Sequence, residues 1–183
     1  MTTELDIARQ IASGELPSPQ SFGASWYWAI RISGTGVAYR SAVDEYCLRE
    51  RSVWLTPEMI QRCACLPVLF EHPHAGMLNS AEFAARCIGL TVLAYVRDDE
   101  LWAVSRILDA NANELLASGE IGDTSPAVTF EPGSGQRLFV DGKPLLIEGN
   151  PRLVDHVCVT PLGVWTRQGE PGIEVTNEED IAA

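Results

Sequence analysis

The sequence predicts a mainly β fold with short helices (α+β), arranged as an antiparallel β-barrel of about seven strands flanked by the helices. Three observations predict this class. Short runs rich in β-branched and aromatic residues recur along the chain. Turn signals of hairpin length separate several of these runs. Helical patterns are few and short, so the regular alternation of strand and helix that a βαβ sheet requires is missing.

The length and charge set the broad organisation. We expect one barrel domain over 23–168, preceded by an N-terminal arm over 1–22 and followed by a flexible acidic tail over 169–183, in a chain of 183 residues. The net charge of −12 argues against a nucleic-acid partner, because phosphate binding depends on Lys and Arg. No apolar run reaches the roughly 20 residues of a membrane helix, so no membrane partner is expected.

The first half of the chain contains one clear helix start and one short buried strand. Thr56 is a typical N-cap and Pro57 suits the first turn that follows it. The expected elements, in order, are a helix over Glu4–Ala12, strands over Ala24–Ile32 and Val37–Arg40, a helix that starts at Pro57 and buries Met59, Ile60 and Cys63, a strand over Pro67–Phe70, and a short helix capped by Ser80.

The second half gives the strongest hairpin signals. Asp98-Asp99-Glu100 and Asp141-Gly142 are turn sequences between strand-like runs. Pro126 cannot donate to a sheet ladder, so its strand begins there or lies at an edge. The expected elements are strands over Ile88–Arg97 and Leu101–Leu108, a helix over Ala110–Ser118 capped by Gly119, and strands over Ser125–Phe130, Arg137–Val140, Leu145–Ile147 and Asp155–Thr160.

The chain has only three histidines, and each lies beside a strand end. These are His72, His74 and His156. Histidine is the side chain whose ordinary pKa is near neutrality, and a serine hydroxyl needs such a base to become a nucleophile. Ser125 as nucleophile, His72 as base and a group at Asp155-His156 as orienter would form a serine-hydrolase triad. There is no Gly-x-Ser-x-Gly elbow, which disfavours an α/β-hydrolase.

A zinc-binding interaction module is a second hypothesis. Cys63, Cys65, His72 and His74 are zinc ligand types within a short stretch of chain. Their spacing is not that of a zinc finger, and Cys63 and Cys65 on a helix would point to different faces. Cysteines as small core residues are the simpler interpretation. The odd number and irregular spacing of the five cysteines favour reduced thiols in a cytoplasm.

Several motifs together resemble a known family. Val37-Ala-Tyr-Arg40 and Thr56-Pro-Glu58 lead to Pro67-Val-Leu-Phe-Glu-His-Pro73. The step from Ser118-Gly119 to Ser125 follows, and then the strand Asp155-His-Val-Cys-Val159. The order is similar to that of the prohead maturation proteases of tailed bacteriophages, in the group whose fold is similar to the herpesvirus assembly protease. The resemblance runs from about Gly36 to about Arg167.

This resemblance implies a herpesvirus-protease-like β-barrel and a serine-type endopeptidase (a hydrolase) of phage procapsid maturation. Ser125 would be the nucleophile and His72 the base, with His156 as third member and Asp155 as its rival. It implies no cofactor and no metal. The substrates would be the scaffold protein, an extension of the major capsid protein and the protease itself, inside the assembling procapsid in the host cytoplasm. A homo-oligomer is compatible with it.

One departure from the family pattern falls next to the nucleophile. The family has Ser-x-Gly-Tyr/Phe, whereas this chain has Ser125-Pro126-Ala127-Val128. Proline has no N–H, so the oxyanion donors must come from elsewhere, and Arg106, Arg152 and Arg167 are candidates. The departure also keeps open a catalytically inactive capsid-assembly (scaffold-associated) factor with the same fold.

Overall fold

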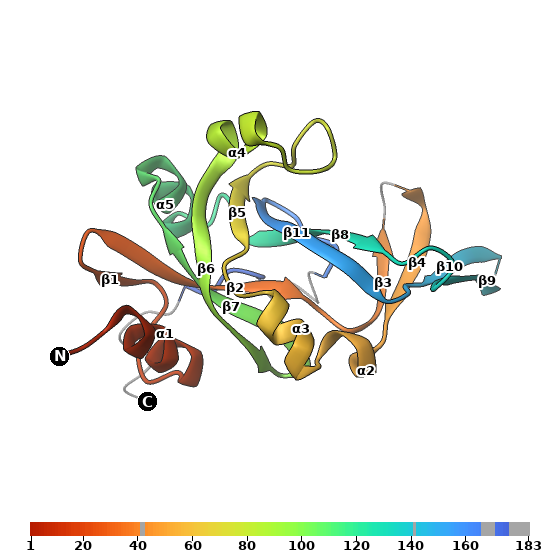
Figure 1. Ribbon diagram of the computed structural model, residues 1–183, viewed down its shortest axis with the longest axis horizontal. Helices are drawn as coiled ribbons and strands as arrows, with labels where there is room; N and C mark the ends of the chain where they lie inside the picture. The colour runs from red at the N-terminus through yellow and green to blue at the C-terminus, as the bar shows by residue number, and fades with distance from the viewer. Residues whose placement is uncertain (41–42, 141, 166–170, 176–183) are drawn as a thin grey trace.

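The computed structural model describes residues 1–40, 43–140, 142–165 and 171–175, and these residues form eleven strands and five short helices (Figure 1). The mainly β class with short helices is confirmed. None of the helices in this part of the chain is long and apolar enough to span a bilayer. The helices are α1 (Glu4–Ser13), α2 (Arg51–Trp54), α3 (Pro57–Arg62), α4 (Ser80–Arg86) and α5 (Ala110–Ala117). The strands are β1 (Gln20–Phe22), β2 (Ser25–Ser33), β3 (Gly36–Arg40), β4 (Glu45–Arg49), β5 (Pro67–Phe70), β6 (Cys87–Arg97), β7 (Glu100–Ile107), β8 (Asp123–Phe130), β9 (Gln136–Val140), β10 (Lys143–Ile147) and β11 (Pro151–Thr160).

Seven strands form a curled, open sheet in the order β1-β2-β7-β6-β5-β11-β8 (Figure 1). Its pairs are antiparallel except for β5 and β11, which run parallel. The expectation of a closed barrel was therefore wrong: the sheet is a half-barrel, with β1 and β8 at its two edges. Edge position suits β8, because Pro126 has no N–H to donate to an outer neighbour.

Residues 172–174 lie across the opening between β2 and the start of β8. The backbone N–H of Arg31 donates to Gly172, and that of Ile173 donates to Gly122 just before β8. Ile173 is buried against β2. These three residues fall within the expected acidic tail, so this part of it belongs to the folded body. Residues 169–170 and 176–183 of that tail lie outside the described residues.

Four further strands form a second sheet in the order β3-β4-β10-β9. The predicted hairpin is present: Val140 of β9 pairs with Lys143 of β10, while Asp141 between them is outside the described residues. β4 was not predicted, and it pairs antiparallel with β3 and parallel with β10. The strands expected to complete one barrel are thus divided between two sheets.

The N-terminal helix α1, within the predicted arm, packs on the large sheet. Thr3 caps α1 in a capping box with Asp6, which satisfies N–H groups that the first turn leaves without partners. Ala8 and Ile11 of α1 are buried against Trp102 and neighbouring side chains of the sheet. This packing stabilises α1, because an amphipathic helix in a protein is stabilised chiefly by burying its apolar side.

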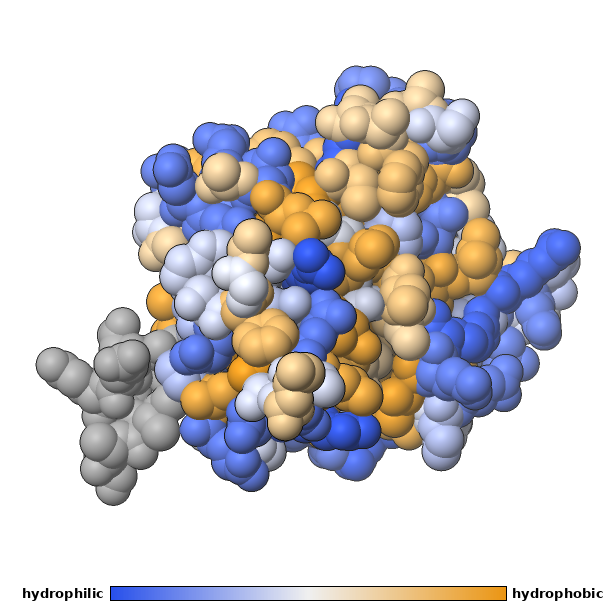
Figure 2. Space-filling view, turned by 60° about the vertical axis from the view of Figure 1, so that its left-hand side comes forward, coloured by the Kyte–Doolittle hydropathy of each residue, from blue (hydrophilic) through white to orange (hydrophobic). Residues whose placement is uncertain are grey.

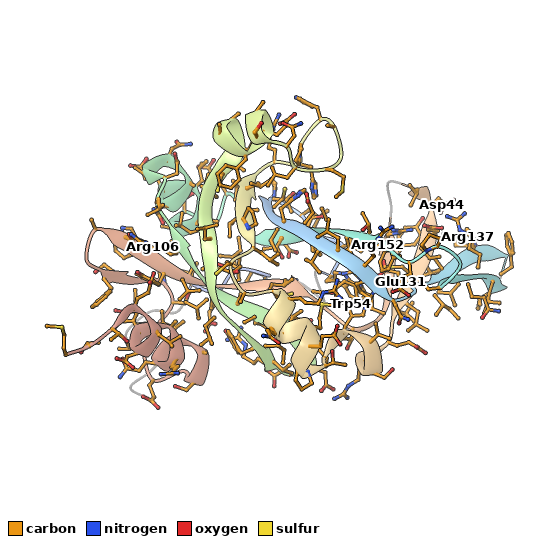
Figure 3. The ribbon with its side chains drawn as sticks, viewed as in Figure 1. Asp44, Trp54, Arg106, Glu131, Arg137 and Arg152 are labelled. Carbon is orange, nitrogen blue, oxygen red and sulfur yellow. The ribbon has the colours of Figure 1, made fainter. Side chains whose placement is uncertain are left out.

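Arg49 joins the two sheets. Its Nη1 donates to Ser33 Oγ of β2 at 2.7 Å, and its guanidinium also binds the buried Glu148. The guanidinium carbon lies 4.2 Å from the ring centre of the fully buried Trp54 (Figure 3) and 5.0 Å from that of Trp165. A buried charge needs such partners to offset its loss of hydration.

Local signals of the sequence located several elements correctly, although several strands begin earlier than predicted, such as β8 at Asp123 and β11 at Pro151. Thr56 Oγ1 accepts from the N–H of Met59 at 3.1 Å and begins α3 as predicted. Asp98 and Asp99 form the β6–β7 turn with φ of 49° and 65°. One cap was assigned wrongly: Asn79, not Ser80, caps α4, because its side chain accepts from two N–H groups of the first turn.

Candidate functional site

His72 lies just beyond β5, where the chain turns back toward β11. Phe70 ends β5 beside Val159 of β11, and Glu71 follows with a left-handed φ of 67°. The His72 ring consequently contacts side chains of β11. His72 is exposed, whereas Pro73 after it is buried. The imidazole therefore has one edge against the protein and another open to solvent.

A β-bulge in β11 aims Asp155 at His156. Neighbouring residues of a regular strand point to opposite faces. The register of β11 against β8 shifts between Val154 and His156, so Asp155 is the additional residue of the bulge. Bulges can re-aim a side chain in this way. The result is a distance of 2.8 Å between Asp155 Oδ2 and Nδ1 of the fully buried His156.

Asp155, His156 and His72 form a hydrogen-bonded series with a defined direction. His156 Nε2 lies 3.0 Å from His72 Nδ1, and Asp155 Oδ2 also accepts from the N–H of Leu78 at 2.8 Å. An ionised carboxylate only accepts hydrogen bonds, so neutral His156 donates through Nδ1 and accepts at Nε2. His72 then donates through Nδ1, which leaves its Nε2 as an acceptor.

Ser125 lies in β8 directly opposite Cys158 of β11. Residues paired across antiparallel strands share a face, with Cβ atoms roughly 4.5–5.5 Å apart. His156 precedes Cys158 by two residues and occupies the same face. Ser125 is half-buried. The hydrogen bonds of the His72 side chain go to His156 and Cys158, so Ser125 is connected to His72 only through its strand partner Cys158.

Cys158 is a member of this cluster that the sequence reasoning missed. Its Sγ lies 3.2 Å from His72 Nδ1. The two-residue spacing from His156 in a strand was the signal that could have found it. Cys158 is fully buried, and burial raises the pKa of its thiol to about 12. The thiol is thus protonated and inaccessible, which disfavours Cys158 as a nucleophile.

Partial burial of the His72 ring lowers its pKa from the usual value of 6.5, because burial penalises the charged form. The neighbouring His156 lowers the pKa of His72 further. The imidazole is therefore neutral at physiological pH, as a general base must be.

The structure does not bring together Cys63, Cys65, His72 and His74, the four residues proposed for the zinc-binding module. Cys63 is buried in the main core, whereas Cys65 is exposed, in a left-handed turn. His74 is exposed, two residues beyond His72. Among the described residues, the cluster with metal-ligand geometry is instead His72, His156 and Cys158.

The arginines considered as oxyanion donors lie in different places. Arg106 is on β7, which β6 and β5 separate from β11, and it binds Ser25 and Glu4. Arg152 is exposed on β11, well separated from Arg106 along the molecule (Figure 3). Arg167 lies outside the described residues. Of the two that are described, Arg152 shares a strand with the histidine series and Arg106 does not.

A concavity lies elsewhere on the surface, apart from the histidine series. It is lined by Trp26 and Trp28 of β2, by Leu108 between β7 and α5, and by residues of α5. Figure 2, in which the β1–β2 end of the molecule comes forward, shows apolar side chains exposed among polar ones on this face. None of the four residues predicted for the triad lines this concavity.

No family model matches the chain, and a search of curated proteins found no similar sequence.

Proposed function

We propose that the protein is a serine endopeptidase of tailed-phage procapsid maturation, which cleaves scaffold and capsid-protein extensions and itself. The observation that carries the proposal is the series Asp155–His156–His72, which presents an acceptor nitrogen beside a strand that bears Ser125. A nucleophile, a base and an orienter are what serine hydrolysis requires. The phage substrates are proposed from the family resemblance of the motifs.

In the proposed reaction, Ser125 Oγ attacks the peptide carbonyl carbon and His72 Nε2 takes the hydroxyl proton. The C–N bond then breaks, and His72 returns this proton to the leaving amine. Water, deprotonated by His72 in turn, hydrolyses the acyl-enzyme. His156 accepts from Nδ1 of His72 throughout, and the Asp155 carboxylate stabilises the positive charge that develops on the two rings.

The position of Ser125 suits an extended substrate. β8 is an edge strand of the large sheet, and Ser125 to Phe130 are half-buried. An extended peptide can add to such an edge through main-chain hydrogen bonds. Pro126 removes one donor from this edge, so the pairing must use the residues on either side of it.

The experiment that tests the proposal compares the native chain with Ser125→Ala and Ser21→Ala. Ser21 is the matched control, because it is exposed on the other edge strand of the same sheet. Each protein is incubated with its capsid and scaffold proteins, free and in procapsids, and the fragments are identified by mass spectrometry. We expect defined cuts from the native chain and Ser21→Ala, and none from Ser125→Ala. Absence of cuts in every sample, or identical cuts in all three, would favour the inactive assembly factor.

The rate of Ser125 acylation should depend on the pKa of His72. Only neutral His72 accepts the serine proton, so the rate rises with pH through this pKa and is lost below it. Because the pKa lies below 6.5, we expect the half-maximal rate below pH 6.5. Labelling by a fluorophosphonate, which reacts with activated serines, measured from pH 4.5 to 8.5 checks this. A midpoint above 6.5 would contradict it.

A further inference from the structure

Three potential metal-ligand atoms converge at the histidine series. His72 Nδ1, His156 Nε2 and Cys158 Sγ all lie within 4.8 Å of one another. The separations of His72 Nδ1 are 3.0 Å to His156 Nε2 and 3.2 Å to Cys158 Sγ. We propose that these three side chains bind one zinc ion and that the bound ion reversibly inhibits the peptidase. The proposal of zinc binding does not depend on the proposed peptidase function, whereas the proposal of inhibition rests on it.

The separations of His72 Nδ1 from the other two ligand atoms would suit a zinc ion if His72 moved away from them by a few tenths of an ångström. Zinc–nitrogen bonds of about 2.0–2.1 Å and a zinc–sulfur bond of about 2.3 Å in a tetrahedron separate two nitrogens by about 3.3 Å and nitrogen from sulfur by about 3.6 Å. The two separations from His72 Nδ1, 3.0 Å and 3.2 Å, are a few tenths of an ångström shorter, as expected where a hydrogen bond occupies the place of an ion. The third pair, His156 Nε2 and Cys158 Sγ, lies within 4.8 Å, so His72 would move slightly outward and the other two side chains would close on the ion. Two imidazoles and a thiol are also a donor set that zinc prefers over calcium or magnesium.

The surroundings supply the remaining requirements of a zinc site. A metal-bound histidine usually donates its other N–H to a carboxylate, which fixes the ring, and His156 Nδ1 donates to Asp155 in this way. His72 is exposed while His156 and Cys158 are buried, so an ion can enter from the solvent side. Zinc deprotonates a coordinating thiol, which removes the obstacle of the protonated Cys158. The fourth position remains for water.

Zinc bound at this site would inhibit the proposed peptidase, because it would hold the His72 imidazole in the tautomer that cannot act as a base. Serine activation requires a lone pair on His72 Nε2. A zinc ion on His72 Nδ1 takes the lone pair of that nitrogen and leaves the ring proton on Nε2. This nitrogen can then only donate, so it cannot accept the proton of Ser125. Removing the metal restores the hydrogen bond between His72 and His156 and, with it, the active tautomer.

Binding is tested on full-length Ser125→Ala, so that the result does not depend on catalysis. We expect one equivalent of zinc in competition with a chromophoric chelator. Co²⁺ should give the visible bands of a tetrahedral site and a thiolate charge-transfer band near the ultraviolet. In this Ser125→Ala background, a second substitution His72→Ala should weaken zinc binding at least 100-fold, whereas His74→Ala should weaken it less than twofold. In the same way, Cys158→Ala should abolish the thiolate band and Cys65→Ala should retain it.

Two results would overturn the site. Binding that depends on His74 and Cys65 would place the ion elsewhere, and absence of stoichiometric binding would remove it. Because His72 is exposed, the His72→Ala result stands even if Cys158→Ala fails to fold, which circular dichroism would show.

Inhibition is tested by fluorophosphonate labelling of the native chain. One equivalent of zinc should lower the rate of labelling at Ser125 at least tenfold, and EDTA should restore it. Labelling that zinc leaves unchanged or accelerates would overturn the inhibitory role while leaving the peptidase proposal intact. Conversely, absence of labelling in the presence of EDTA, together with normal zinc binding, would count against the peptidase and leave only the zinc site.

Discussion

Replacement of Arg31 by methionine is expected to lower the free energy of unfolding by about 3–5 kcal/mol. Arg31 lies in β2 with only 2% of its side chain exposed, and it forms ion pairs with Glu100 at 3.4 Å and Asp123 at 3.1 Å. Both carboxylates are also buried. Methionine keeps much of the side-chain length but removes the cation between two buried negative charges, and their loss of hydration is then poorly offset.

The measurement is urea unfolding followed by circular dichroism, with Arg51→Met as the control. Arg51 pairs with Asp99, but these side chains are 62% and 53% exposed. Exposed pairs contribute at most about 1 kcal/mol. Equal losses of stability in the two variants would contradict the importance of burial for the Arg31 network.

The Arg31 network also connects the scaffold to the candidate site. Asp123 opens β8 two residues before Ser125, and the Thr124 hydroxyl donates to the backbone carbonyl of Arg31. These contacts hold the start of β8 beside β2 across the open side of the half-barrel. Arg31→Met should therefore also slow fluorophosphonate labelling at Ser125, even when labelling is measured without urea and the variant is folded.

Elements that depend on neighbouring residues could be predicted from the sequence. The strand over Pro67–Phe70 has the predicted boundaries, and the helix capped by Thr56 begins at Pro57 as predicted, because a cap, a proline and a short apolar run act locally. The β6–β7 hairpin was also found, since its two strands are joined by a turn of acidic residues.

The division into two sheets depends on contacts between distant residues, which periodicity does not encode. Arg49 meets Glu148 and Ser33 only in the folded chain, and these contacts set β4 against β2. β4 begins and ends with buried charged residues, Glu45 and Arg49. Such a segment resembles a polar loop until its ion pairs are known. The packing of α1 was missed for the same reason. The sequence shows that α1 has an apolar side, but it does not show which strands that side packs against.

The candidate site shows the same limit. The rarity of histidine indicated His72 and His156, and Ser125 at a strand start was proposed as the nucleophile and supported by the family resemblance, but the sequence left His156 and Asp155 as rivals. The structure places both in one series, because a bulge turns Asp155 toward His156. A bulge depends on the register of two strands, so the alternation of residues along one strand could not reveal it.

This series predicts the effect of removing the carboxylate. Asp155→Ala should slow acylation of Ser125 by about 10²–10⁴-fold, with an upper limit set by the roughly 10⁴-fold decrease in kcat that follows loss of the orienting carboxylate in a Ser-His-Asp triad. Without Asp155, either nitrogen of His156 can carry the proton. When the proton lies on Nε2, His156 donates to His72, and His72 then holds its own proton on Nε2, where it cannot act as a base.

Asp155→Asn separates the charge of this carboxylate from its geometry. The same oxygen accepts from Leu78 N and His156 Nδ1, so an asparagine that presents its amide oxygen at this place keeps both hydrogen bonds and loses only the negative charge. We expect a smaller decrease, about 10–100-fold, with the pH midpoint of labelling lowered because a carboxylate near a histidine favours its charged form. Labelling rates and far-UV circular dichroism of the three proteins provide the measurement. If Asp155→Ala labels Ser125 at the native rate while it remains folded, the proton on His72 is not directed through His156, and the proposed order of the series is wrong.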